Sequence, residues 1–113
     1  TAETDEEARY LRSSQILAFA RLRPGRPGKL PRPVKRLSAE IPSQVMAQVQ
    51  QSLFCSATGS LDTVRRELGA LVAKYQPDEL IVTGMIHDHA ARLRSFAMTA
   101  EALGEIVKTT KAA

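Results

Sequence analysis

The chain has 113 residues, 43% of them hydrophobic and 25% charged, which is enough for one globular domain with a core but not for two. The formal net charge is +4, and a single cysteine, Cys55, excludes an internal disulfide and fits a reducing compartment. No apolar run approaches the roughly 18 residues of a membrane span, so we expect a cytoplasmic protein without membrane contact.

The first predicted element is a helix over residues 5–22. Thr4 is placed to cap its first amides, and the acidic residues that follow Thr4 favour the positive end of the helix dipole. Apolar side chains recur at helical spacing, at Ala8, Leu11, Phe19 and Leu22. We therefore expect this helix to pack its apolar face against the rest of the domain.

Residues 23–42 form a basic insertion rich in proline and glycine, which excludes a continuous helix or a central strand. Seven cations fall within residues 21–36, namely Arg21, Arg23, Arg26, Lys29, Arg32, Lys35 and Arg36. One interpretation is a small basic binding or assembly module that contacts anions or nucleic acid through this segment. The other is a solvated loop. The segment contains no Phe or Tyr for base stacking, so a nucleic-acid partner is not expected.

Two apolar runs in the second half predict strands. A helix over residues 43–53 leads into the first run, residues 53–57, and the second run covers residues 80–83. Neither run alternates with polar residues, which is typical of strands that are covered on both faces. We predict that both are parallel strands, although two strands alone do not make a stable parallel sheet.

A helix is predicted after each strand. Ser60 can cap a helix over residues 61–75, and Gly59 allows the tight turn that precedes it. Asp88 begins the last helix, which we expect to end at Gly104. Residues 53–104 therefore predict a βαβα unit within a single segment that covers the whole chain.

Several stretches resemble the luciferase-like, flavin-dependent monooxygenases. They are Thr-Asp-Glu-Glu-Ala (residues 4–8), Arg-Pro-Gly-Arg-Pro-Gly-Lys-Leu-Pro (23–31), Cys-Ser-Ala-Thr-Gly-Ser-Leu-Asp-Thr-Val (55–64), Asp-Glu-Leu-Ile-Val-Thr (78–83) and His-Asp-His-Ala-Ala-Arg-Leu-Arg-Ser-Phe (87–96). The resemblance runs from Ala2 to Leu103 and matches the carboxyl-terminal third of that family. One departure is Leu61, where the family commonly has proline.

The resemblance implies an α/β fold: carboxyl-terminal βα units of a (β/α)8 TIM barrel, incomplete here and helix-rich as an isolated chain. It also implies a parent enzyme that uses O2 and reduced FMN, or a deazaflavin in some branches, to oxidise a small organic substrate. A flavin reductase partner and a homo-oligomer belong to the same expectation. The 113-residue segment alone is expected to be inactive, because most of the flavin site would lie upstream.

The resemblance also implies where the site residues lie. Thr83, Gly84 and Met85 would contact the flavin at the end of the second strand, and Ser56 and Thr58 would contact it at the end of the first. His87 is the candidate catalytic residue, as a proton donor. The alternatives are a strand end and turn for Thr83 and Gly84, a plain helix cap at Ser60 in place of a site at Ser56 and Thr58, and a solvated or capping His87. Cys55, His87 and His89 are too few for a zinc site, so no metal is expected.

Overall fold

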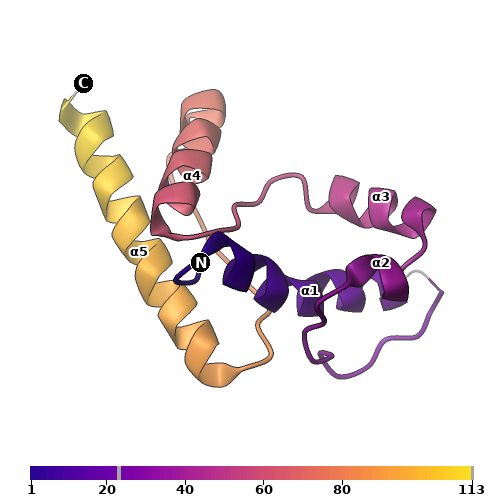
Figure 1. Cartoon of the computed structure of the whole chain (residues 1–113). Helices are drawn as coiled ribbons and strands as arrows, with labels where there is room; N and C mark the ends of the chain where they lie inside the picture. Colours follow the sequence, from indigo (N-terminus) through magenta and orange to yellow (C-terminus); the bar gives the residue numbers. More distant parts are fainter. Residues whose placement is uncertain (23, 113) are drawn as a thin grey trace.

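All regular secondary structure in the described residues is helical (Figure 1). The computed structural model describes residues 1–22 and 24–112, and Arg23 and Ala113 lie outside the described residues. The helices are α1 (Asp5–Leu22), α2 (Leu37–Glu40), α3 (Ser43–Ser52), α4 (Leu61–Tyr75) and α5 (His89–Ala112). The first helix and α4 have the same bounds as the helices expected from the sequence, whereas α2 is a short turn of helix that the sequence analysis did not anticipate.

The predicted fold class is wrong for this structure. No strand occurs among residues 1–22 and 24–112, so the chain does not form α/β units of a TIM barrel. Residues 53–57 and 80–83, the two predicted strands, lie in irregular connections. A strand requires a neighbouring strand for its backbone N–H and C=O groups. Residues 78–86 form no backbone–backbone hydrogen bond within the described ranges, and Ile81 is 92% exposed rather than buried.

The helices pack in two groups (Figure 1). In one group α1 packs against α2 and α3, and in the other α4 packs against α5. The first group encloses a cluster of buried apolar side chains from α1, α3 and the residue after α2: Ile16, Leu17, Ile41 and Val49. The second encloses a cluster from α4 and α5: Val64, Leu68 and Ala102. Arg65 of α4 also pairs with Glu105 of α5 and so links these two helices by charge.

A third cluster connects the two groups. Ala8 and Leu11 of α1 pack against Ala91 of α5, and Ile86 covers them from the side. The Cα radius of gyration is 14.9 Å, compared with about 13 Å for a compact domain of this length. The excess shows that the two helix groups are joined by a small contact rather than by one continuous core. The first half of α1 therefore lies at the junction, which is where the candidate site is found.

Two predicted helix ends have different outcomes. Asp88 caps α5 as expected, because its carboxylate accepts the Ala91 amide at 2.9 Å. Gly104 does not end α5, which continues to Ala112, and this correction has a packing reason. Leu103 and Ile106 on either side of Gly104 pack on the cluster shared with α4, so the last turns of α5 gain burial that a glycine cap would forfeit.

Within residues 1–22 and 24–112, no helix combines the length and the hydropathy that crossing a bilayer would require.

Candidate functional site

The candidate site is a cavity of about 300 Å³ at the junction of the two helix groups. Its walls come from α1, the segment before α4, α4 itself, the irregular segment before α5, and the first half of α5. All five residues for which we expected cofactor contact line it: Ser56, Thr58, Thr83, Gly84 and Met85. The loss of the two strands has therefore not separated these residues, which still face one cavity.

Arg12 of α1 is the one charged side chain among the cavity's lining residues. Its guanidinium donates to the hydroxyl of Ser56 at 3.0 Å and to the hydroxyl of Thr58. It forms no ion pair within the described residues, where the salt bridges belong to Arg65 and Arg94. Burial lowers the pKa of the Arg12 guanidinium, and the nearby Glu67 carboxylate partly opposes that shift.

The loop that follows α3 is folded around these polar groups. The Ser56 hydroxyl donates to the Leu53 carbonyl at 2.6 Å while it accepts from Arg12. The Thr58 amide donates to the Glu67 carboxylate of α4 at 2.9 Å. Glu67 is not among the cavity's lining residues. The arrangement holds two hydroxyls beside the Arg12 guanidinium, while the Glu67 carboxylate is hydrogen-bonded to the backbone of the loop.

The amino-terminal end of α4 already has an anionic partner. Asp5 of α1 accepts the Ser60 amide at 2.7 Å, and this hydrogen bond is the main reason that the pKa of Asp5 is lowered; a hydrogen bond with Thr63 adds to it. The backbone of Gly59 passes so close that an added Cβ would lie 2.5 Å from the Asp5 carboxylate. A phosphate at this helix end would meet that carboxylate.

His87 lies apart from the cavity. It is exposed in the turn before α5 and is not among the cavity's lining residues. His89 begins α5 and its ring contacts Arg92 at 3.1 Å on the helix surface. Cys55 lines the cavity but is exposed, together with its neighbour Phe54, although the sequence led us to expect burial. The reason is the same as for the missing strand: residues 53–57 have no neighbouring strand to cover them.

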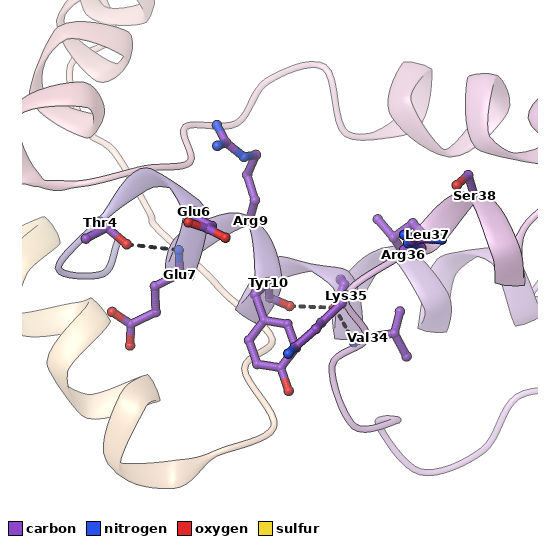
Figure 2. Close-up of a pocket in the computed structure, with 11 residues that line it drawn as sticks. Thr4, Glu6, Glu7, Arg9, Tyr10, Val34, Lys35, Arg36, Leu37 and Ser38 are labelled. Carbon is purple, nitrogen blue, oxygen red and sulfur yellow. Dashed lines mark hydrogen bonds between the residues drawn. The ribbon is translucent and has the colours of Figure 1, made fainter.

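A second, larger hollow of about 750 Å³ lies between the first half of α1 and the segment that enters α2 (Figure 2). Figure 2 shows the side chains of Glu6, Glu7 and Arg9 on the α1 side and those of Lys35 and Arg36 on the other. We call it the groove. It is open and lined by charges of both signs, and it holds none of the predicted site residues.

Arg12 and Asp5 are the polar residues that sequence reasoning missed. Arg12 follows Ala8 by four residues and precedes Gln15 by three, so it interrupts the apolar stripe of its helix. A cation within such a stripe is a usable signal that the helix faces a polar partner. Asp5 gave no comparable signal, because an acidic residue in a first helical turn is already explained by its own helix.

Comparison with known proteins finds similarity along nearly the whole chain. A luciferase-like monooxygenase of Escherichia coli (strain K12) is 33% identical over 106 residues, which are 94% of this chain and 32% of the relative. A protein of the same name from Escherichia coli O6:H1 (strain CFT073) gives the same values. The uncharacterized protein YvbT of Bacillus subtilis (strain 168) is 31% identical over 100 residues, which are 88% of this chain and 30% of YvbT.

No family model matches the chain, and no solved structure matches it. The chain spans about a third of the length of the curated relatives it matches. Two of these relatives carry the name luciferase-like monooxygenase, and the similarity extends well beyond the motifs at residues 55–64, 78–83 and 87–96. The chain is therefore similar, over 94% of its length, to part of proteins named luciferase-like monooxygenase.

Proposed function

We propose that this chain supplies part of a flavin-dependent monooxygenase that uses reduced FMN and O2 to oxidise a small organic substrate. The observation that carries the proposal is the 33% identity over 94% of the chain to proteins named luciferase-like monooxygenase. The convergence of Ser56, Thr58, Thr83, Gly84 and Met85 on one cavity supports it independently. The flavin would supply the oxygen chemistry when bound, and the protein would position the substrate and exclude water.

The cavity lies at the lower end of the size range of small-molecule sites, which is about 300–1,000 Å³. The proposal therefore assigns the cavity to the organic substrate and to the edge of the flavin that faces it. Thr83 would donate or accept a hydrogen bond there, and Gly84, with open space around its Cβ position, would let a ring approach the backbone.

A hybrid protein tests the proposal. In the E. coli K12 relative, the matching third is replaced by this chain, and the binding of reduced FMN is measured without oxygen. We expect the hybrid to bind reduced FMN with a Kd within about tenfold of the intact relative, a difference of about 1.4 kcal/mol. A hybrid that folds by circular dichroism but has lost FMN binding would contradict the proposal. A hybrid that does not fold, or an intact relative without FMN affinity, would count against it as well.

The basic insertion favours a second candidate function, binding of a polyanion by residues 21–36. In the described part of that segment, the side chains of all six cations are exposed and form no ion pair: Arg21, Arg26, Lys29, Arg32, Lys35 and Arg36. Arg23, a seventh cation in the sequence, lies outside the described residues. A cluster of solvated cations without acidic partners attracts phosphate backbones by counterion release.

A salt titration separates this candidate from a solvated loop. If all six cations contact a single-stranded oligonucleotide, a plot of log affinity against log salt should have a slope of about −4, because each neutralised phosphate contributes about −0.7. The affinity is measured by fluorescence anisotropy between 50 and 200 mM salt, values over which such slopes are commonly compared. No binding at the lowest salt, or an affinity that does not change with salt, would exclude a polyanion-binding arm.

A further inference from the structure

The cavity has an unusual combination of lining groups. Its walls are mostly aliphatic or aromatic, and they include Leu11, Leu53, Val64, Leu68, Leu71 and Phe96. Its polar groups are the Arg12 guanidinium, the ammonium of Thr1, which donates to the Ser95 hydroxyl at 2.8 Å, and neutral hydroxyls, amides and one thiol. A cavity with apolar walls and a few convergent polar groups is typical of a small-molecule site. Here both charged groups are cations, and Arg12 is the one charged side chain among the lining residues.

The charge of Arg12 is only partly compensated. Its two hydrogen bonds go to neutral hydroxyls, and Glu67, the nearest carboxylate that influences it, accepts the Thr58 amide instead of a guanidinium hydrogen. Arg12 is half-buried, and a cation that is partly withdrawn from water without an anionic partner costs free energy unless a counter-charge is supplied. A guanidinium carries five N–H donors, of which the hydrogen bonds to Ser56 and Thr58 use two. Donors therefore remain for an anion that enters the cavity.

We propose that Arg12 anchors a small organic carboxylate in this cavity, with the apolar part of the ligand against the side chains of α4 and α5. The volume lies at the lower end of the range of small-molecule sites, about 300–1,000 Å³, which favours a small ligand such as an arene with one carboxylate. Two guanidinium donors match the two oxygens of a carboxylate, an arrangement that a neutral amide of the same shape cannot reproduce. Within the proposed function, this anion is the organic substrate.

Benzoate is the probe, because it has the charge, the size and the apolar ring that the cavity requires. Benzamide has the same shape without the charge, and inorganic phosphate has the charge without the ring. Binding of each is followed by chemical-shift changes in a 1H–15N spectrum of the labelled full chain at constant pH and ionic strength. We expect benzoate to bind with a Kd on the order of 1 mM, since small ligands gain limited free energy per atom. Shifts should concentrate at Thr83, Gly84 and Ser95, which line the cavity.

Comparing the affinities of benzoate, benzamide and phosphate for the wild-type chain tests the proposal without any variant. A hydrogen bond to a charged group changes affinity by roughly tenfold to a hundredfold, so benzamide and phosphate should each bind at least about tenfold more weakly than benzoate. Arg12→Gln should lower the benzoate affinity to that of benzamide. Arg9→Gln is the matched control, because Arg9 is an exposed cation of the same helix that lines the groove instead. It should leave the benzoate affinity unchanged.

Equal affinities for benzoate and benzamide would overturn the proposal, as would shifts confined to residues outside the cavity. Equal losses in Arg12→Gln and Arg9→Gln would do the same, because they would indicate a general charge effect. If Arg12→Gln fails to fold, the ratio of the benzoate affinity to the benzamide affinity in the wild-type chain still tests the proposal. The inference rests on the proposed function only where it calls the anion a substrate. If benzoate binds through Arg12 but the hybrid does not bind FMN, the carboxylate site is supported and the proposed monooxygenase function is contradicted.

Discussion

The cavity and the groove differ in charge and in exposure to solvent, and ranking them by volume alone would select the groove as the candidate site. The groove is the larger hollow, about 750 Å³ against about 300 Å³, but its charges of both signs are open to solvent. The cavity contains one charged side chain, Arg12, and the Thr1 ammonium among apolar walls and hydroxyls. Water screens the groove's charges, so they contribute little specificity. In the cavity, the half-buried charge of Arg12 can determine which ligand binds. The charge and solvent exposure of the lining groups, rather than the volume of the hollow, therefore identify the candidate site.

The strongest way to break the comparison is to disrupt the junction that forms the cavity. Gly59 has φ +155°, and an added Cβ would lie 2.5 Å from the Asp5 carboxylate and 2.6 Å from Thr63 Cβ. We expect Gly59→Ala to lower the free energy of unfolding by about 2–4 kcal/mol, because both the backbone conformation and the contact become unfavourable. Urea denaturation measures the change.

Gly28→Ala is the control for that prediction. Gly28 lies in the basic insertion and has no atom within 4 Å of its Cβ position. It should change the free energy of unfolding by less than about 0.5 kcal/mol. Equal effects of the two substitutions would show that the close approach of Asp5 to Gly59 does not hold the junction together.

A second substitution tests the apolar wall. Val64 lines the cavity, is 1% exposed and belongs to the cluster between α4 and α5. Val64→Ala should lower the free energy of unfolding by about 2 kcal/mol, through the lost transfer of two methyl groups and the space left behind. Val107→Ala removes the same atoms from an exposed position of α5, so its expected change lies within about 0.5 kcal/mol. Similar losses at both positions, again from urea denaturation, would contradict a packed wall at Val64.

The third prediction concerns acid. The hydrogen bond from the Ser60 amide lowers the pKa of Asp5 below its ordinary value of 3.8, so the folded state binds this proton less readily than the unfolded state does. Asp5 therefore stabilises the fold above pH 3.8, and the contribution disappears as the pH falls through the lowered pKa. Asp5→Asn keeps an oxygen that can accept the Ser60 amide but removes the charge, so stability should depend less on pH in that range.

Thermal unfolding between pH 5 and pH 2.5, a range of the order over which such carboxylates titrate, measures that dependence. Glu6→Gln, which removes an exposed carboxylate of the same helix, is the control. If Asp5→Asn and the wild type lose stability in parallel, the contact between Asp5 and the start of α4 has no electrostatic role.

The smallest expected change in the free energy of unfolding comes from a substitution in α5, which forms one wall of the cavity. Gly104 lies inside this helix in open space. Gly104→Ala should therefore raise the free energy of unfolding by about 0.5–1 kcal/mol, the difference in helix propensity between the two residues. A loss of stability would instead indicate that the helix ends at this glycine, as the sequence had led us to expect.

Local signals in the sequence were sufficient for helices and insufficient for strands. The bounds of α1 and α4 followed from Thr4, Ser60 and the apolar spacing, because caps and helical periodicity are properties of a few neighbouring residues. The apolar run at residues 80–83 predicts a strand only if another segment pairs with it, and the described structure offers none. The prediction that the last helix ends at Gly104 was wrong for a similar reason, because Leu103 and Ile106 pack on α4 and the helix continues past the glycine.

The site was partly predictable. Five of the predicted residues share one cavity, because the end of one apolar run and the end of the other both lie beside the first half of α1. Arg12 was not predicted, because the apolar spacing of its helix indicated packing and the expected flavin contacts lay where the two strands would end. His87 was placed at the cavity by the expected strand, and without that strand the turn carries it outward into solvent.

The exchange of guanidinium protons tests the central contrast most directly. Arg12 and Arg9 lie one turn apart on α1, one in the cavity and the other at the groove. In an 15N-edited spectrum of the full chain at one pH, we predict that the side-chain N–H protons of Arg12 exchange with water at least about tenfold more slowly than those of Arg9, because hydrogen bonding and burial remove them from solvent. Equal exchange rates for the two arginines would contradict the account, since Arg12 would then be as hydrated as a surface residue.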